Sequence, residues 1–177
     1  MESDEKLLER ALRGHEGSFT RLFRSRQSAI YRFALHMSGD TAVAEDVTQE
    51  VFLTLIQNGD RFDPARGTLL SFLYGIARNL VLRRIEKDGA AELDGEEASH
   101  EVGVLDQLTR RETIEQVRRA VLSLPAVYRE AVVLCDLQDW SYQAAAEALD
   151  CPVGTVRSRL NRGRAMLAQK LAGESVA

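Results

Sequence analysis

The chain has 177 residues, of which 45% are hydrophobic, and its formal net charge is −4 at pH 7. This length allows one domain or two small ones, and the chain contains no run of about 20 apolar residues that would span a membrane. The charged start MESDEKLLER lacks the apolar stretch of a secretion signal, and two cysteines do not make a disulfide framework, so we expect a cytosolic protein. Glycine motifs for phosphate, dinucleotide or nucleophile sites are missing, as are CxxC and HxxxH pairs, so we expect no enzyme, metal or cofactor.

Four helices are predicted in the first half of the chain. Its apolar residues recur at helical spacing, and strand-like alternation bounded by turn signals does not occur. Turns that contain glycine separate the helical segments, and a longer loop surrounds Asp63 and Pro64. The expected helices are 4–13, 16–38, 41–57 and 68–86.

The helix at 41–57 is predicted to be amphipathic. Its apolar stripe at i, i+4 spacing should face the core and comprises Val43, Val47, Val51 and Leu55. Beside this stripe lies a polar and acidic patch that would suit docking onto a basic partner helix. On these residues alone, an ordinary solvated helix face is the better interpretation. The candidate docking residues are Asp46, Gln49, Glu50, Phe52 and Leu53.

The loop at 58–67 and the helix that follows combine arginines with aromatic side chains. This combination suits an unpaired nucleic-acid strand, because its bases need a face on which to stack and its phosphates attract cations. Core packing is the alternative role for single aromatics such as Phe62 and Phe72. Leu69, Leu73, Ile76 and Leu80 should form the buried stripe of the helix. The candidate strand contacts are Arg61, Phe62, Arg66, Ser71, Tyr74, Arg78, Asn79 and Arg83.

An acidic segment follows these helices. Residues 86–101 hold seven acidic side chains against one lysine and few large apolar residues, so we predict a flexible, solvated linker at 87–107. A long surface loop within one domain is the alternative, although such loops are uncommon in a compact fold. The predicted fold is therefore all-α, with helical domains at 1–86 and 108–177.

Four further helices are expected at 109–122, 126–138, 142–149 and 153–171. Ser141 is a good helix cap, Asp150 stands where the turn favours a left-handed conformation, and Pro152 suits the start of the next helix. The third and fourth of these helices therefore have the layout of a helix-turn-helix.

The last helix presents a basic face opposite an apolar stripe. Val156, Leu160 and Leu167 share one side, and short hydrogen-bonding side chains alternate with arginines on the other. Arginine can form bidentate hydrogen bonds with guanine or phosphate, and asparagine can do so with adenine. DNA recognition is therefore favoured over an ordinary charged surface. Arg157 and Arg164 flank the stripe, where they would hold phosphate or brace the domain. The candidate contacts are Thr155, Arg157, Ser158, Arg159, Asn161, Arg162 and Arg164.

The segment PVGTVRSRLNRGR at 152–164 closely resembles the promoter-reading helix of bacterial extracytoplasmic-function (ECF) sigma factors, in the sigma-70 family. DTAVAEDVTQEVFLTL at 40–55 resembles the polymerase-binding helix of that family, and FDPARGTLLSFLYGIARNLVLRR at 62–84 its neighbouring loop and helix. Four positions depart from the usual pattern, namely Phe72 for Trp, Arg83 for Asp, Ala144 for Glu and Asp150 for Gly.

The resemblance implies a division of labour among the candidate residues. The docking set on 41–57 would bind the β′ clamp helices of core RNA polymerase, and the C-terminal domain would contact the β flap. The set at 61–83 would open and read the promoter −10 element, and the last helix would read the −35 element as duplex DNA. Core polymerase, promoter DNA and an anti-sigma factor are the implied partners, without membrane insertion.

The residues alone do not exclude two other functions. A stand-alone helix-turn-helix regulator would bind specific DNA tightly without polymerase, and a sequestering interaction module would support no transcription. A hydrolase or transferase is the remote third, because its motifs are missing.

Overall fold

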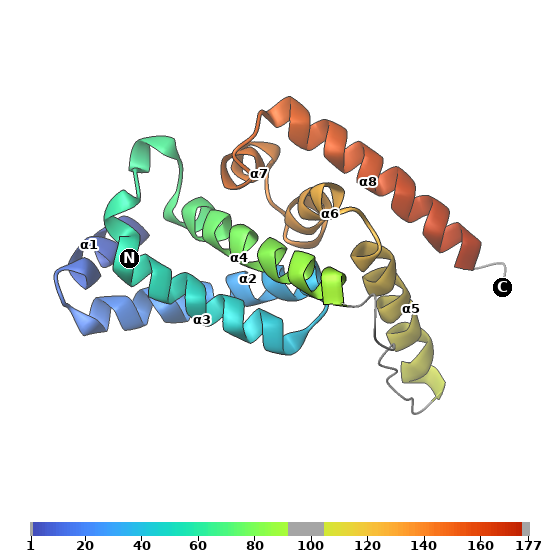
Figure 1. Cartoon of the computed structure of the whole chain (residues 1–177), viewed down its shortest axis with the longest axis horizontal. Coiled ribbons are helices and arrows are strands. Elements are labelled where there is room, and N and C mark those ends of the chain that lie inside the picture. Colours follow the sequence, from blue (N-terminus) through green and yellow to red (C-terminus); the bar gives the residue numbers. More distant parts are fainter. Residues whose placement is uncertain (1, 92–104, 175–177) are drawn as a thin grey trace.

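The computed structural model describes residues 2–91 and 105–174, with side chains up to Lys87 in the first range and from Glu112 to Gly173 in the second. Every regular element in these two ranges is helical, as the sequence predicts (Figure 1). The N-terminal part consists of α1 (Asp4–Leu12), α2 (Glu16–Ser38), α3 (Thr41–Asn58), the short turns η1 (Gly59–Arg61) and η2 (Pro64–Arg66), and α4 (Leu69–Ala91). The C-terminal part consists of α5 (Leu105–Leu122), α6 (Ala126–Val132) with its π-helical continuation η4 (Val133–Leu137), α7 (Tyr142–Ala148) and α8 (Val153–Glu174).

All eight predicted helices are confirmed, most within one or two residues of their expected ends. The larger differences border the acidic segment, where α4 continues through Ala91 and α5 begins at Leu105. Helices therefore extend into both ends of the predicted linker at 87–107, and its residues 92–104 lie outside the described part of the chain.

The N-terminal core forms where α2, α3 and α4 pack on one another. Val47, Val51 and Leu55 of the predicted α3 stripe are fully buried, whereas Val43 is only partly covered. Each such aliphatic side chain contributes roughly 1.5–3 kcal/mol by leaving water. Asp40 starts α3 by accepting hydrogen bonds from the backbone amides of Ala42 and Val43, at 2.7 and 3.2 Å. This cap fixes where the polar face of α3 begins.

The C-terminal core places α8 across α6 and α7. Val156 and Leu160 are buried, as the helical wheel predicts. Gly163 permits the close approach of α6 and α8, because a Cβ atom at this position would lie 2.8 Å from Cγ2 of Val132. On α7, Ala145 and Ala146 are buried and let the neighbouring helices pack closely. The opposite face of α8 remains open (Figure 1).

The two parts of the chain also pack against each other. Helix α4 lies between the N-terminal helices and the pair α6 and α7, with α7 directly against it (Figure 1). Helix α2 contacts α5, α6 and η4. None of the helices described is both long and apolar enough to cross a membrane.

Candidate nucleic-acid interface

The outer face of α8 carries five candidate side chains that are open to solvent or only partly covered. Ser158, Asn161 and Arg162 are exposed, and Thr155 and Arg159 are partly exposed. Nη1 of Arg162 donates a long hydrogen bond to the Tyr128 hydroxyl at 3.4 Å. These polar groups therefore remain available to a polyanion.

The other two arginines of α8 are engaged within their own domain. Arg164 donates to both carboxylate oxygens of Asp136, from Nε at 3.0 Å and from Nη2 at 2.6 Å. This hydrogen bonding raises the pKa of Arg164. The guanidinium of Arg157 lies 5.8 Å from the centre of the Tyr142 ring. Both arginines brace α8, which is one of the two roles expected from their place beside the apolar stripe.

The turn between α7 and α8 has the predicted geometry. Asp150 adopts φ 48°, a left-handed conformation that is uncommon without glycine. The Ser141 hydroxyl caps α7 by accepting from the Ala144 amide at 3.1 Å. The carbonyl of Pro152 accepts the first hydrogen bond of α8, from Thr155 at 2.9 Å. These contacts fix the angle at which α8 leaves the turn.

A second candidate surface is a pocket of about 470 Å³ beside the loop 61–68. The rings of Phe62 and Phe72 line it 5.6 Å apart, and both are partly buried against the hydrophobic core. Arg61, Arg66 and Asn79 line the same pocket and are exposed. The pocket therefore brings two aromatic rings together with arginines.

Three candidate strand contacts are buried or largely covered, unlike the others. Ser71 and Tyr74 are buried, at 5% and 1% exposure, and Arg78 is largely covered. The hydroxyl of Ser71 lies 3.0 Å from that of Thr68, whose side chain caps the start of α4. Tyr74 and Arg78 face the C-terminal domain, which helical periodicity cannot reveal. Arg83 is exposed, and its Nε donates to the carbonyl of Asn79 at 3.1 Å.

The docking surface expected on α3 is mostly open. Asp46 and Gln49 are exposed, and Leu53 is 57% exposed. Glu50 forms an ion pair with Arg84 at 2.7 Å, which places it at the edge of the surface. Phe52 is only 2% exposed and packs on Phe23 with a ring distance of 4.8 Å. Its side chain therefore supports this surface from behind.

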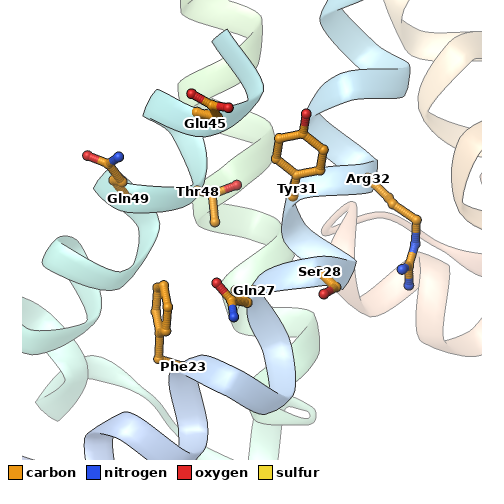
Figure 2. A pocket seen from close by; sticks show the side chains of 8 residues that line it. All are labelled: Phe23, Gln27, Ser28, Tyr31, Arg32, Glu45, Thr48 and Gln49. Carbon is orange, nitrogen blue, oxygen red and sulfur yellow. The ribbon is translucent and has the colours of Figure 1, made fainter. Parts of the chain in front are cut away.

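Sequence reasoning missed Ile56, which is 51% exposed. It lies one helical turn beyond Leu53, so the i, i+3 spacing of two large apolar residues outside the buried stripe was the available signal. A groove of about 410 Å³ runs between α2 and α3 next to this surface, and Figure 2 shows its lining side chains. Gln49 belongs to both the groove and the α3 surface.

Known protein families match both parts of the chain. Residues 22–90 match the family model Sigma-70 region 2, and residues 114–167 match Sigma-70, region 4. The ECF RNA polymerase sigma factor SigW of Bacillus subtilis is 32% identical over 179 aligned positions, covering 94% of this chain and 95% of SigW.

The chain belongs to the ECF sigma factors. This sigma factor is also 34% identical over 164 positions to the ECF RNA polymerase sigma factor SigE of Mycolicibacterium smegmatis. That alignment covers 89% of this sigma factor and 63% of SigE. Region 2 therefore contains most of α2 together with α3 and nearly all of α4, whereas region 4 runs from within α5 into α8.

Two solved structures resemble this sigma factor over most of its length. The sigma factor RpoE of Bartonella quintana, solved with the anti-sigma factor NepR, is 27% identical with a TM-score of 0.67, and 87% of this chain aligns with 96% of RpoE. CnrH, solved with the cytosolic domain of CnrY, is 23% identical with a TM-score of 0.74, and 97% of this chain aligns with 99% of CnrH. The likeness to CnrH supports the fold of this sigma factor.

Proposed function

We propose that this sigma factor recruits core RNA polymerase to promoters by dividing recognition between its two domains. The observation that carries the proposal is that the arginines on α8 differ in their contacts within the protein. Arg157 and Arg164 contact Tyr142 and Asp136 within region 4, whereas Arg162 is exposed beside Ser158 and Asn161, with Arg159 partly exposed on the same face. Such a face fits the edges of bases in a major groove, so we assign it to the −35 element.

The pocket beside the loop 61–68 is the proposed site for the −10 strand. Its paired rings of Phe62 and Phe72 offer a surface for an unstacked base, and Arg61 and Arg66 offer cations to the adjoining phosphates. Extruding a base costs a few kcal/mol, which contacts in such a pocket offset. Phe72 stands where the family usually has Trp, so the wall for the base is smaller here.

The exposed patch on α3 is the proposed contact with core polymerase. Leu53 and Ile56 supply apolar area, and Asp46 and Gln49 supply a polar and acidic rim. A largely open apolar pair with a polar rim is the usual make-up of a protein interface. We assign this patch to the β′ clamp helices, and we expect region 4 to make a second contact with the β flap.

The remaining partners and properties are proposed from the family. RpoE and CnrH were solved with an anti-sigma factor and with a cytosolic domain, respectively, so we expect an anti-sigma factor to regulate this chain as well. We further propose that the protein works in the cytoplasm and is not an enzyme. The functional division that we propose is 1–86 for polymerase and the −10 element, 87–107 as tether, and 108–177 for the −35 element.

Run-off transcription with purified core polymerase and a library of promoter fragments tests this function. We expect a subset of fragments to yield transcripts only when this protein is added. A stand-alone regulator is the second candidate, and it would bind a specific duplex tightly without polymerase. Fragments should therefore also be tested for binding to the free protein by fluorescence anisotropy. Tight specific binding of the free protein together with no promoter-specific transcript would refute the sigma-factor assignment.

A further inference from the structure

Helix α1 lies next to the loop that forms the proposed −10 pocket, at the same end of the molecule (Figure 1). Its C-terminal end contacts η1, and near its start Glu5 lines a second pocket together with residues 64–68. Helix α1 precedes residues 22–90, the part of the chain that matches Sigma-70 region 2. The match with region 2 therefore gives α1 no role.

Gly59 is the point at which α1 and the loop meet. A Cβ atom on this residue would lie 3.1 Å from Cδ2 of Leu12 and 3.2 Å from Cδ1 of Leu8. The φ angle of Gly59 is −66°, which every amino acid adopts, so the backbone does not require glycine here. Glycine is needed because the methyl groups of the two leucines leave too little space for a side chain.

Gly59 in turn holds an aromatic residue of the pocket. Its carbonyl accepts a hydrogen bond from the Phe62 amide at 3.2 Å, which closes the turn η1. The Phe62 ring lies 5.6 Å from that of Phe72, and Arg61 of the same turn also lines the pocket. A displacement of Gly59 therefore moves one aromatic ring and one cation of the pocket.

Ion pairs anchor the start of α1 on α2. Asp4 and Arg26 are paired at 2.7 Å, and the Asp4 side chain is only 16% exposed. Glu2 accepts hydrogen bonds from Arg10 of α1 and Arg21 of α2, at 3.0 and 3.1 Å. Such partly exposed pairs add little to stability one by one, but together they set the orientation of α1 on α2. The helix is thus anchored independently of the loop that it supports.

We infer that α1 is a positioning element for −10 recognition, in which Leu8 and Leu12 hold Gly59 and so determine where Arg61 and Phe62 lie in the pocket. The inference rests on the proposed function, which assigns this pocket to a DNA strand. Neither leucine is among the residues that line the pocket, so their effect on DNA is exerted only through η1. Because a binding site needs its contacts placed within about 0.5 Å, a small displacement of η1 changes which bases the pocket accepts.

Gly59→Ala tests the inference in the full-length protein. The added Cβ atom meets the ends of two flexible side chains, so η1 must move by a few tenths of an ångström while the fold is kept. Adding Leu12→Ala to this variant removes the nearest methyl group and should return η1 part of the way. Gly17→Ala is the matched control, because its added Cβ atom lies 3.5 Å from the His15 ring, an ordinary van der Waals contact.

Run-off transcription with core polymerase measures the consequence, with promoter libraries varied at the −10 or at the −35 element. We expect Gly59→Ala to change the relative yields among −10 sequences by about fivefold, the lower end of what one mismatched base pair costs. The double variant should recover much of that change, and Gly17→Ala should show none. Yields among −35 sequences and affinity for core polymerase should stay unchanged in every variant. An equal change at both elements, or no change at the −10 element, would overturn the inference.

Leu12→Ala is the second variant, and it keeps the test decisive if circular dichroism shows that Gly59→Ala does not fold. The Leu12 side chain is 41% exposed, so its truncation costs little stability, and it removes one of the two leucines that hold Gly59. In hydrogen exchange the Phe62 amide should lose protection by about fivefold, whereas the amides of α3 should keep theirs. The same variant should lose selectivity among −10 sequences in the transcription assay.

The two measurements separate failure of the inference from failure of the proposed function. Unchanged protection of the Phe62 amide, or faster exchange with unchanged −10 selectivity, would overturn the role of α1 and leave the proposed function intact. A wild type that yields no promoter-specific transcript would remove the proposed function and the −10 role of α1 with it. The exchange result would then still show that α1 holds the loop.

Discussion

Nε of Arg78 on α4 lies 2.9 Å from Oε1 of Glu130 on α6, and this ion pair joins region 2 to region 4. The Glu130 side chain is fully buried. Loss of hydration raises the pKa of its carboxyl group above the ordinary value of 4.5, although Arg78 and then Arg159 oppose the shift. A buried ion pair of this kind is weak evidence for stability, because desolvation offsets much of the attraction. Its clearer consequence is a dependence of folding on pH.

Glu130→Gln should remove one component of that pH dependence. The folded protein binds more protons than the unfolded chain between pH 4.5 and the raised pKa of Glu130, so its contribution to the free energy of unfolding is present at low pH and falls as the pH rises. Urea unfolding of both proteins at a series of pH values measures the effect. The wild type should lose stability relative to Glu130→Gln as the pH increases. A difference that stays constant or changes in the opposite direction would contradict the burial of this carboxylate.

Gly163→Ala should destabilise region 4. The added Cβ atom would lie 2.8 Å from Cγ2 of Val132 and 3.3 Å from the carbonyl oxygen of Tyr128, so α6 and α8 must separate. Overpacking of this kind typically costs about 1–3 kcal/mol. Gly154→Ala is the matched control on the same helix, because nothing lies within 4 Å of its added Cβ atom.

Alanine at position 154 should instead stabilise the helix, by up to about 1 kcal/mol, through its higher helix propensity. The free energy of unfolding in urea distinguishes the two variants. Equal effects of the two substitutions would show that the contact between α6 and α8 is looser than described.

Substitutions of Asp150 should follow the backbone conformation of the turn. At φ 48° glycine is free of strain, aspartate is tolerated, and alanine meets a cost of about 1–2 kcal/mol. The expected order of unfolding midpoints is therefore Asp150→Gly at or above the wild type, and Asp150→Ala below it. The side chain is exposed, so lost packing does not complicate the comparison. A midpoint for alanine equal to that for glycine would argue against a left-handed turn.

Leu53→Asp should weaken binding to core polymerase while leaving the fold intact. Leu53 is 57% exposed, so an aspartate there remains solvated in the free protein but would be buried without a partner in the complex. We expect a loss of tenfold or more in affinity, about the effect of truncating a residue at the centre of an interface. Ile114→Asp is the control, because Ile114 is 62% exposed on α5 and lies outside the proposed patch. Comparable losses for both variants, measured by fluorescence titration, would remove α3 as the main contact.

Sequence reasoning could predict the helices and their caps because those depend on neighbouring residues. Ser141 and Asp150 each act through backbone groups within a few positions, so their roles can be inferred without knowing the fold. The open face of α8 could also be predicted, since Val156 and Leu160 mark the buried side.

The packing between the domains could not be predicted in this way. Helical periodicity indicates one buried stripe on α4, but it does not reveal that a second domain covers Tyr74 and Arg78 on another side. Phe52 lies so close to the apolar stripe of α3 that only the positions of Phe19 and Phe23 decide its burial. Contacts between residues far apart in the chain are absent from local patterns, and they determine which candidate site residues are open.

The central claim is that α8 reads one promoter element while region 2 holds the polymerase. The most direct test is Arg159→Ala with Arg162→Ala, compared with the wild type in run-off transcription from a promoter library varied at the −35 element. The charge-matched control is Lys6→Ala with Arg24→Ala, two exposed positions outside α8. The account predicts that the α8 variant loses selectivity among −35 sequences but binds core polymerase as the wild type does, and that the control keeps both. Retained selectivity, or an equal loss of polymerase binding, would contradict it.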